Sequence, residues 1–353
     1  MPSIVLFFAI ISGLLSITLL ADPLHETYDP QQNRVLTING AADYPEIKPL
    51  LEEFHKAHPD ISVNYTELST RELFRKVATE QDPDIDIVMS SAMDLQIQLI
   101  NDGLAQKFTS RETDSLPGWA SWREEIYGYS YEPATISINR KYFEGLTIPK
   151  SRADLLSVIR KHPDRFSGKI GTFDITRVGV GYLLWAYDSQ QTGSYGRILE
   201  SFGAHHVRMF PSSSSMLSEL ASGQIGIAYN VLGSYSNSWA LAHPDIEVIL
   251  PNDYTTVLMR SLFIPKTAKN AADARTFINY LLSETGQKVL AEKSSLYPIR
   301  EGLSDDGDLK SLRVSVRGPL RPIPLGLPLL VLNDKMKKQL LYEEWERALI
   351  EWE

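Results

Sequence analysis

The fold is decided by residues 83–104, PDIDIVMSSAMDLQIQLINDGL. This stretch begins with the apolar run Ile85–Met89, which is typical of a buried strand. Ser90 and Ser91 follow, and apolar residues then recur at helical spacing up to Gly103, which stands where a helix end favours glycine. A strand, a two-serine corner and a helix bring backbone N–H groups and two hydroxyls to one point. Such a corner suits the oxygens of a small ligand, although it can equally serve only to cap the helix.

Two further strand–helix units precede this stretch. Residues 34–39 and 61–65 are expected to be strands, and each is followed by a segment with apolar residues at helical spacing. The order β-α-β-α-β-α over residues 34–104 predicts an α/β fold with a parallel sheet, in which ligands bind at the carboxyl ends of the strands. The first strand is followed by the small corner Gly40–Tyr44. We therefore expect this corner and Ser90–Ser91 to lie at one edge of the sheet.

The amino-acid composition narrows the possible classes of protein. The chain has 353 residues, of which 43% are hydrophobic and 22% charged, as in a soluble globular protein with room for two domains. The net charge of −9 argues against a nucleic-acid partner but is compatible with a local basic pocket for an anion. The absence of cysteine excludes disulfides, thiolate metal ligands, a cysteine nucleophile and a lipid-modified cysteine. An exported chain without cysteine fits the bacterial periplasm.

The N-terminus indicates export. Residues 1–20 are almost wholly apolar and uncharged, and a polar segment follows them. We interpret residues 1–21 as a signal peptide that is cleaved after Ala21, which predicts a periplasmic protein. The alternative is an uncleaved anchor, because about 20 apolar residues are also enough to span a bilayer.

The middle of the chain predicts a second domain. Residues 116–133 are rich in tyrosine and tryptophan, and we interpret them as a crossing between two domains. The aromatic side chains, Tyr131 among them, either line a cleft or pack between the domains. Residues 145–250 have their own strands and helices. Within them, the corner GTFDITR at 171–177 and the segment YNVLGSY at 229–235 offer further groups that could contact a ligand.

Three stretches resemble a known family. Residues 265–302 read PKTAKNAADARTFINYLLSETGQKVLAEKSSLYPIREG, and this pattern resembles extracytoplasmic solute-binding proteins of ABC transporters. The resemblance is to the type 2 periplasmic class, whose members include ferric-iron and sugar-phosphate binders. Residues 83–104 and ISINRKYF at 136–143 are similar to further stretches of that class. The resemblance covers about residues 34–302.

The family implies two α/β lobes joined by a hinge of crossing strands. The expected lobe 1 comprises residues 34–133 and 260–302, and lobe 2 comprises residues 134–259. We expect residues 303–353 to be a C-terminal extension that packs on lobe 1. In such proteins the ligand is buried when the lobes close, and the closed form docks onto a membrane permease. No bond is made or broken, so we expect a non-enzymatic monomer without a cofactor.

The nature of the ligand is the open point. The iron binders of this class use two adjacent tyrosines from the second lobe, whereas Tyr229 is followed here by Asn230 and Val231. Hydroxyls, an amide and Arg177 instead favour a small organic anion, of which a phosphorylated metabolite is one kind. Two alternatives stay open. One is a ferric-iron-binding protein, and the other is a ligand sensor that regulates a membrane kinase, because SSAMDLQ resembles regulatory binding proteins of phosphoglycerate uptake.

These expectations define a set of candidate ligand-binding residues from both lobes and the crossing. We expect no catalytic residue and no metal site. The candidates are Ala42, Asp43, Tyr44, Ser90, Ser91, Tyr131, Thr172, Asp174, Thr176, Arg177, Tyr229, Asn230 and Tyr235.

Overall fold

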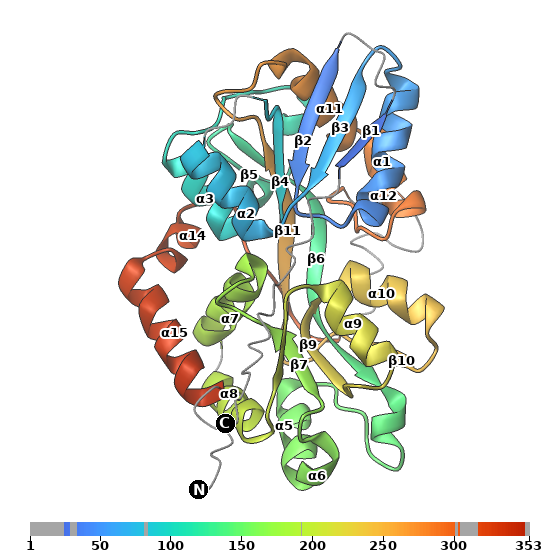
Figure 1. Ribbon diagram of the computed structural model, residues 1–353, viewed down its shortest axis with the longest axis vertical. Coiled ribbons are helices and arrows are strands. Elements are labelled where there is room, and N and C mark those ends of the chain that lie inside the picture. The colour runs from blue at the N-terminus through green and yellow to red at the C-terminus, as the bar shows by residue number, and fades with distance from the viewer. Residues whose placement is uncertain are drawn as a thin grey trace, which may run out of the picture.

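The molecule consists of two α/β lobes connected by two long strands (Figure 1). The computed structural model describes residues 25–28, 34–80, 84–191, 193–300, 303 and 317–349. The expected signal peptide, and with it the alternative of an anchor, lies outside the described residues. Within the described part of the chain, no helix combines the length and the apolar character needed to cross a membrane.

Lobe 1 contains a parallel sheet and the strand–corner–helix unit of residues 83–104. Strand β2 is parallel to both β3 and β4, as the β-α-β-α-β-α pattern predicted. The elements of this lobe are β1 (His25–Tyr28), β2 (Val35–Gly40), α1 (Tyr44–Ala57), β3 (Ser62–Glu67), α2 (Thr70–Arg75), the π-helical turn η1 (Lys76–Glu80), β4 (Ile87–Ser90), α3 (Met93–Asn101), α4 (Arg111–Asp114), η2 (Gly118–Ala120), β5 (Ser121–Trp122), α11 (Ala271–Leu282) and α12 (Glu284–Lys293).

Local sequence accounts for these elements. Helix α1 has a proline in its first turn and buries the stripe Ile47, Leu50, Leu51 and Phe54 against the sheet. Helix α3 starts directly after the two-serine corner and ends before Gly103, whose φ of +76° is the left-handed conformation that glycine adopts without strain.

Lobe 2 has its own sheet and surrounding helices. Strands β7 and β8 are parallel, and β7 also lies parallel to β9. The elements are η3 (Arg140–Phe143), α5 (Arg152–Lys161), α6 (Pro163–Phe166), β7 (Ile170–Phe173), α7 (Gly179–Gln191), α8 (Tyr195–Ala204), β8 (Arg208–Phe210), α9 (Ser213–Ala221), β9 (Ile227–Leu232), α10 (Gly233–Ala242) and β10 (Ile246–Ile249).

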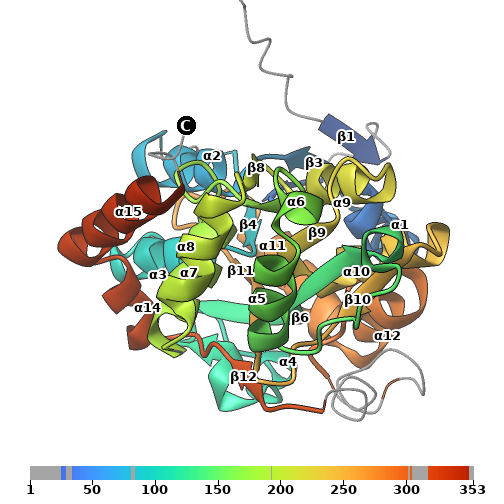
Figure 2. The same cartoon turned by 90° about the horizontal axis from the view of Figure 1, so that it is seen from below.

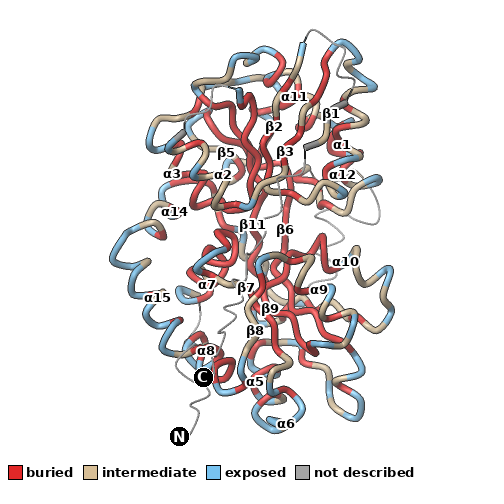
Figure 3. Tube along the Cα trace, in the orientation of Figure 1, coloured by how far each residue is buried: buried red, intermediate tan, exposed pale blue. Residues whose placement is uncertain are grey.

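Strands β6 (Ile126–Asn139) and β11 (Thr255–Phe263) connect the lobes. Strand β6 pairs with β11 up to Pro133 and with β9 of lobe 2 from Ala134 onward. The partner of β6 therefore changes at the position where the sequence placed the first lobe boundary. All residues of both crossing strands are buried, and the buried interior runs along them from one lobe to the other (Figure 3).

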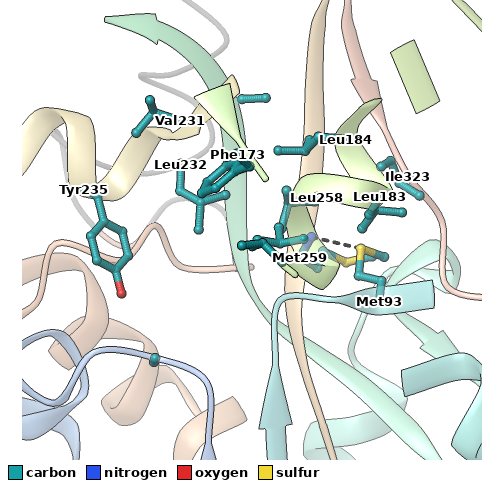
Figure 4. Packing of buried hydrophobic residues seen from close by; sticks show 14 of the residues in the cluster. Met93, Phe173, Leu183, Leu184, Val231, Leu232, Tyr235, Leu258, Met259 and Ile323 are labelled. Carbon is teal, nitrogen blue, oxygen red and sulfur yellow. Dashed lines mark hydrogen bonds between the residues drawn. The ribbon is translucent and has the colours of Figure 1, made fainter. Parts of the chain in front are cut away.

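The apolar core continues through the junction of the lobes. Met93 of lobe 1, Leu183 of lobe 2 and Met259 of the crossing belong to one cluster (Figure 4). The backbone N–H of Met259 points at the sulfur of Met93, with the two atoms 3.2 Å apart. The lobes are thus packed together in this structure, and side chains from both exclude water from the crossing.

The C-terminal extension departs from expectation. It contains β12 (Leu320–Pro322), α14 (Leu327–Leu332) and α15 (Lys335–Leu349). Helix α14 packs on lobe 1, against α3, whereas α15 packs mainly on lobe 2, against α8 (Figure 2). The hydroxyl of Tyr342 in α15 also accepts a hydrogen bond from Arg71 of lobe 1 at 2.7 Å. The physical reason is Trp345, a fully buried side chain of α15 that inserts beside the aromatic core of lobe 2. The extension therefore bridges both lobes instead of packing on lobe 1 alone.

Candidate ligand-binding site

The corner that ends β2 meets lobe 2 directly. The backbone N–H of Asp43 donates to the hydroxyl of Tyr235, with 3.1 Å between the atoms, and the Ser214 hydroxyl donates to the Asp43 carboxylate at 2.5 Å. Figure 4 shows the Tyr235 oxygen pointing toward the ribbon of lobe 1. Within lobe 1, the Tyr65 hydroxyl donates to the carbonyl oxygen of Ala42 at 2.6 Å. Three predicted residues, Ala42, Asp43 and Tyr235, thus come together at the junction of the lobes.

The second predicted corner lies beside the first. Gly40 of β2 pairs with Met89 of β4, and the N–H of Ala41 donates to the Met89 carbonyl at 2.9 Å. Ser90 and Ser91 follow at once, both buried, and the Ser90 hydroxyl accepts the N–H of Ala92 at 3.1 Å. The prediction that both corners occupy one edge of the sheet is confirmed by this pairing.

A buried ion pair that the sequence analysis did not single out lies next to these corners. Arg260 on β11 is only 1% exposed, and it neighbours Ser261, the partner of Ser90 in the sheet. Its Nε donates to Glu132 on β6 at 3.1 Å, and its guanidinium lies 5.3 Å from the ring centroid of Tyr235. Among the described residues, its Nη2 has no hydrogen-bond partner.

The start of α10 completes this group. Glu132, which has no exposed surface, accepts the backbone N–H of Ser234 at 3.4 Å in addition to the Arg260 Nε–H. The Ser234 hydroxyl is buried and, like Arg260 Nη2, unpartnered within the described part of the chain. Two unsatisfied polar groups therefore flank one carboxylate at the crossing. Buried polar groups of this kind usually have a partner, and the oxygen atoms of a ligand would supply one.

Two further glutamates, Glu46 and Glu67, lie near the first corner. Burial raises the pKa of Glu46, and the charges of Asp43 and Glu132 raise it too, while Arg260 acts in the opposite direction. Burial likewise raises the pKa of Glu67, which accepts the N–H of Tyr44 at 2.7 Å. The junction thus combines one buried cation with several acidic groups.

Tyr131 lies in a small apolar cluster of the crossing. Its ring packs edge-on against Trp119, with centroids 5.8 Å apart, and it shares the cluster with Val257. Its backbone N–H donates to the carbonyl oxygen of Tyr297 at 2.9 Å. These contacts correspond to the packing alternative that the sequence left open for the aromatic segment.

Tyr229 and Asn230 point into the interior of lobe 2. The Tyr229 hydroxyl donates to Asp188 at 3.0 Å and accepts from Arg152 at 2.8 Å, and the Asn230 amide donates to the same aspartate at 3.0 Å. The Thr172 hydroxyl accepts the indole N–H of Trp185 at 3.0 Å. The polar atoms that the sequence assigned to a ligand are therefore engaged inside lobe 2.

The corner after β7 forms a surface turn. Asp174 accepts the N–H of Thr176 at 2.9 Å and its hydroxyl at 2.5 Å. The Arg177 side chain is 83% exposed, with its Nε 3.5 Å from the Asp174 carboxylate. This placement corresponds to an exposed arginine near the start of a helix and separates it from the buried Arg260.

The comparisons with known proteins agree with this architecture. Residues 50–313 match the family described as bacterial extracellular solute-binding protein. The substrate binding protein of an ABC transporter from Agrobacterium tumefaciens is 31% identical, with a TM-score of 0.88 over 93% of this chain and 98% of that chain. No curated protein gives a significant match.

Two more distant structures share the fold. AfuA from Actinobacillus pleuropneumoniae, a periplasmic binding protein solved with fructose-6-phosphate, is 17% identical, with a TM-score of 0.73 over 90% of this chain and 99% of that chain. Iron-bound HitA from Pseudomonas aeruginosa is 16% identical, with a TM-score of 0.69 over 89% of this chain and 99% of that chain. From the family match and the Agrobacterium structure, we conclude that the chain belongs to the bacterial extracellular solute-binding proteins, non-enzymatic substrate-binding components of ABC transporters.

Proposed function

We propose that the protein acts in the periplasm, where it captures a small organic anion between its lobes and delivers it to a membrane permease. The observation that carries this proposal is the Arg260 guanidinium, which is buried yet has an unpartnered Nη2 among the described residues. A buried donor without a partner costs about 1–3 kcal/mol, and a ligand oxygen would remove that cost. A guanidinium also matches the geometry of carboxylate and phosphate groups.

The surroundings of Arg260 provide further groups for an anion. The backbone at the start of α10 carries the partial positive charge of a helix N-terminus, and the Ser234 hydroxyl is free to donate. Ser90 is the last residue of β4, the strand next to β11, and Ser91 follows it. Phosphorylated metabolites and carboxylates both offer oxygens that such donors bind.

Closure of the lobes would assemble this site. Asp43 belongs to lobe 1, whereas its two partners Tyr235 and Ser214 belong to lobe 2, so these hydrogen bonds form only when the lobes are together. Opening breaks them and exposes the Arg260 region to solvent. Binding of the ligand then favours the closed state by adding contacts that the open state lacks.

The proposed site contains only part of the sequence-based set. We retain Ala42, Asp43, Tyr44, Ser90, Ser91 and Tyr235, and we add Glu132, Ser234 and Arg260. We leave out the residues that face the lobe 2 interior, the small crossing cluster or the solvent. These are Tyr131, Thr172, Asp174, Thr176, Arg177, Tyr229 and Asn230.

A binding screen with two arginine variants tests the proposal. Three-carbon phosphates, sugar phosphates, dicarboxylates and ferric citrate are tested by thermal shift, and calorimetry then measures the dissociation constant of the best ligand. Arg260→Gln should weaken binding by roughly 1.5–3 kcal/mol, as expected for a hydrogen bond to a charged group. The matched control Arg177→Gln, which removes an exposed arginine, should leave the dissociation constant unchanged.

The folded state of the variants must be checked, because Arg260→Gln leaves Glu132 buried without its cation. The double variant Arg260→Gln/Glu132→Gln removes both charges and keeps the test valid if the single variant unfolds. An unchanged affinity in a folded Arg260 variant would refute the proposal. A thermal shift with ferric citrate alone would instead support the iron-binding alternative.

A further inference from the structure

We infer that the ligand is a zwitterion, with an anionic group held by Arg260 and an ammonium group held by Asp43 and Glu46. The inference rests on the function proposed above and narrows it from organic anions in general to anions that also carry an amine. It follows from the balance of charge at the junction, from the partial burial of the acidic groups and from the aromatic rings beside them.

The junction holds more acidic than basic groups. Arg260 and Glu132 form a buried ion pair whose charges cancel. Asp43, Glu46 and Glu67 remain, and they act on one another, because Asp43 raises the pKa of both glutamates. Arg260 is the only cation among the described groups that shift the pKa of Glu46, and it is already paired.

The remaining lysine of this region, Lys48, lies one turn along α1 and is half exposed. Its ammonium is 3.8 Å from Glu52 on the same helix and 5.8 Å from the centroid of the Tyr44 ring. Among the described ion pairs it has none with Asp43, Glu46 or Glu67. A simple dianion would bring two negative charges to a place with one paired guanidinium and three other carboxylates. A ligand that brings its own cation avoids this repulsion.

Partial burial makes a carboxylate without a nearby cation unfavourable. Glu46 is half-buried, and its pKa is raised above the ordinary value chiefly for that reason. The Ser295 hydroxyl donates to this carboxylate, but no charged partner reaches it among the described hydrogen bonds and ion pairs. An ammonium group at this point would stabilise the ionised carboxylates of Glu46 and Asp43 at once.

A second observation points to a ligand independently of the acidic groups. Arg260 Nη2 and Ser234 Oγ are both buried and unpartnered within the described residues, and both belong to groups bound to Glu132. They define the anionic end of the ligand. Tyr235 links this end to the acidic groups, because its ring centroid lies 5.3 Å from the Arg260 guanidinium and its hydroxyl accepts the N–H of Asp43 at 3.1 Å. Glu46 lies in the same helical turn as Asp43, so one small molecule can contact both ends.

Aromatic rings lie beside the acidic end. The rings of Tyr44 and Tyr65 have centroids 6.2 Å apart and planes inclined by 35°. The Tyr44 ring already attracts one cation, the ammonium of Lys48, at 5.8 Å from its centroid. Aromatic faces beside carboxylates favour an ammonium group over a hydroxyl.

Matched ligand pairs test this inference on the full mature chain. Ethanolamine phosphate is compared with ethylene glycol monophosphate, and β-alanine with its hydroxy analogue, so that each pair differs only in ammonium against hydroxyl. Calorimetry near neutral pH should show that the amine member of a pair binds about ten- to a hundredfold more tightly. Equal or tighter binding of the hydroxyl member would overturn the inference.

Three variants locate the ammonium group. Glu46→Gln and Asp43→Asn should each reduce the ratio of the two affinities, since each removes one negative charge beside the amine. Glu52→Gln, on the exposed side of the same helix, should preserve the ratio. A preference for the amine that survives both Glu46→Gln and Asp43→Asn would also contradict the inference.

The Arg260 variant distinguishes failure of the zwitterion inference from failure of the proposed anion-binding function. Arg260→Gln should weaken both members of a pair by a similar factor, because both carry the anionic group. If both members of a pair bind equally and both lose affinity in Arg260→Gln, the proposed anion site is supported and the zwitterion inference is wrong. If no anion in either pair or in the wider screen binds, the proposed function itself fails.

Discussion

The indole ring of Trp345 packs edge-on against that of Trp185, with centroids 4.9 Å apart and planes at 77°. Trp345 belongs to the C-terminal helix α15, whereas Trp185 lies in α7 of lobe 2 and donates its indole N–H to Thr172. Both side chains are fully buried. The C-terminal extension is therefore part of the hydrophobic core of lobe 2 and contributes to its stability.

Trp345→Ala should destabilise the protein by about 3–5 kcal/mol, the range for truncating a large buried aromatic side chain. Chemical denaturation of the purified protein measures the change in the free energy of unfolding. The control is Trp239→Ala, because Trp239 is only half buried and stacks on His243 at 5.2 Å. Equal losses in the two variants would show that α15 contributes nothing particular to the core.

Asp188→Asn should also be strongly destabilising. Asp188 accepts hydrogen bonds from Tyr229, Asn230 and Tyr254 and is paired with the buried Arg152. Removing one partner of a buried ion pair typically costs about 3–5 kcal/mol, because the other charge stays buried. Urea unfolding measures this loss.

A surface ion pair provides the control for that variant. Glu200→Gln removes an exposed carboxylate that lies 3.5 Å from Arg160 in the same lobe. Its cost should stay below about 1 kcal/mol, as is usual for exposed pairs. Because Asp188 lies away from the junction of the lobes, a folded Asp188 variant should keep its ligand affinity. A large loss of affinity would place the lobe 2 network in the binding site after all.

Asp94→Asn should stabilise the protein in a pH-dependent way. Asp94 of α3 is fully buried, and burial raises the pKa of its carboxyl to about 6, against the opposing charges of Lys338 and Arg71. Because the folded state holds this proton more tightly than the unfolded state, stability falls as the pH rises from about 4 to 6. Above pH 6 the native protein carries the full cost of the buried charge.

The Asn variant lacks that cost. Near neutral pH it should exceed the native protein in stability by about 2–3 kcal/mol, and the difference should vanish near pH 4. Denaturation curves at several pH values measure this difference, and Asp102→Asn at the exposed end of the same helix serves as the control. A less stable Asp94→Asn protein at neutral pH would mean that Lys338 and Arg71 stabilise the charge more than burial opposes it.

Periodic features of the sequence were sufficient to predict the sheet of lobe 1. The apolar run before Ser90 and the stripe of α1 are local patterns, and a parallel order places both corners at one edge. The site itself depends on distant pairs. Arg260 is the one charged residue of β11, but its partner Glu132 is 128 residues away, and no local pattern links the two.

The direction of the side chains of β9 in lobe 2 was harder to predict. Asn230 has a φ of +62°, and the pairing of β6 with β9 shifts register beside it. This bulge adds a residue to the strand and alters which side chains face which side. The alternation of side chains along a regular strand therefore could not predict that Tyr229 and Asn230 both form hydrogen bonds with Asp188. In the same way, Trp345 is separated from its partner Trp185 by most of lobe 2 in sequence.

The bridge formed by α14 and α15 limits how the lobes can move. The N–H group of the Asn333 side chain donates to the carbonyl of Asp94 in lobe 1 at 2.7 Å, while Trp345 is fixed in lobe 2. This bridge lies on one side of β6 and β11, and α1 and α10, which flank the site, lie on the other (Figure 1). The C-terminal segment therefore joins the lobes at a third place besides the two crossing strands. We expect this third connection to restrict sliding of the lobes more than an opening on the side of α1 and α10.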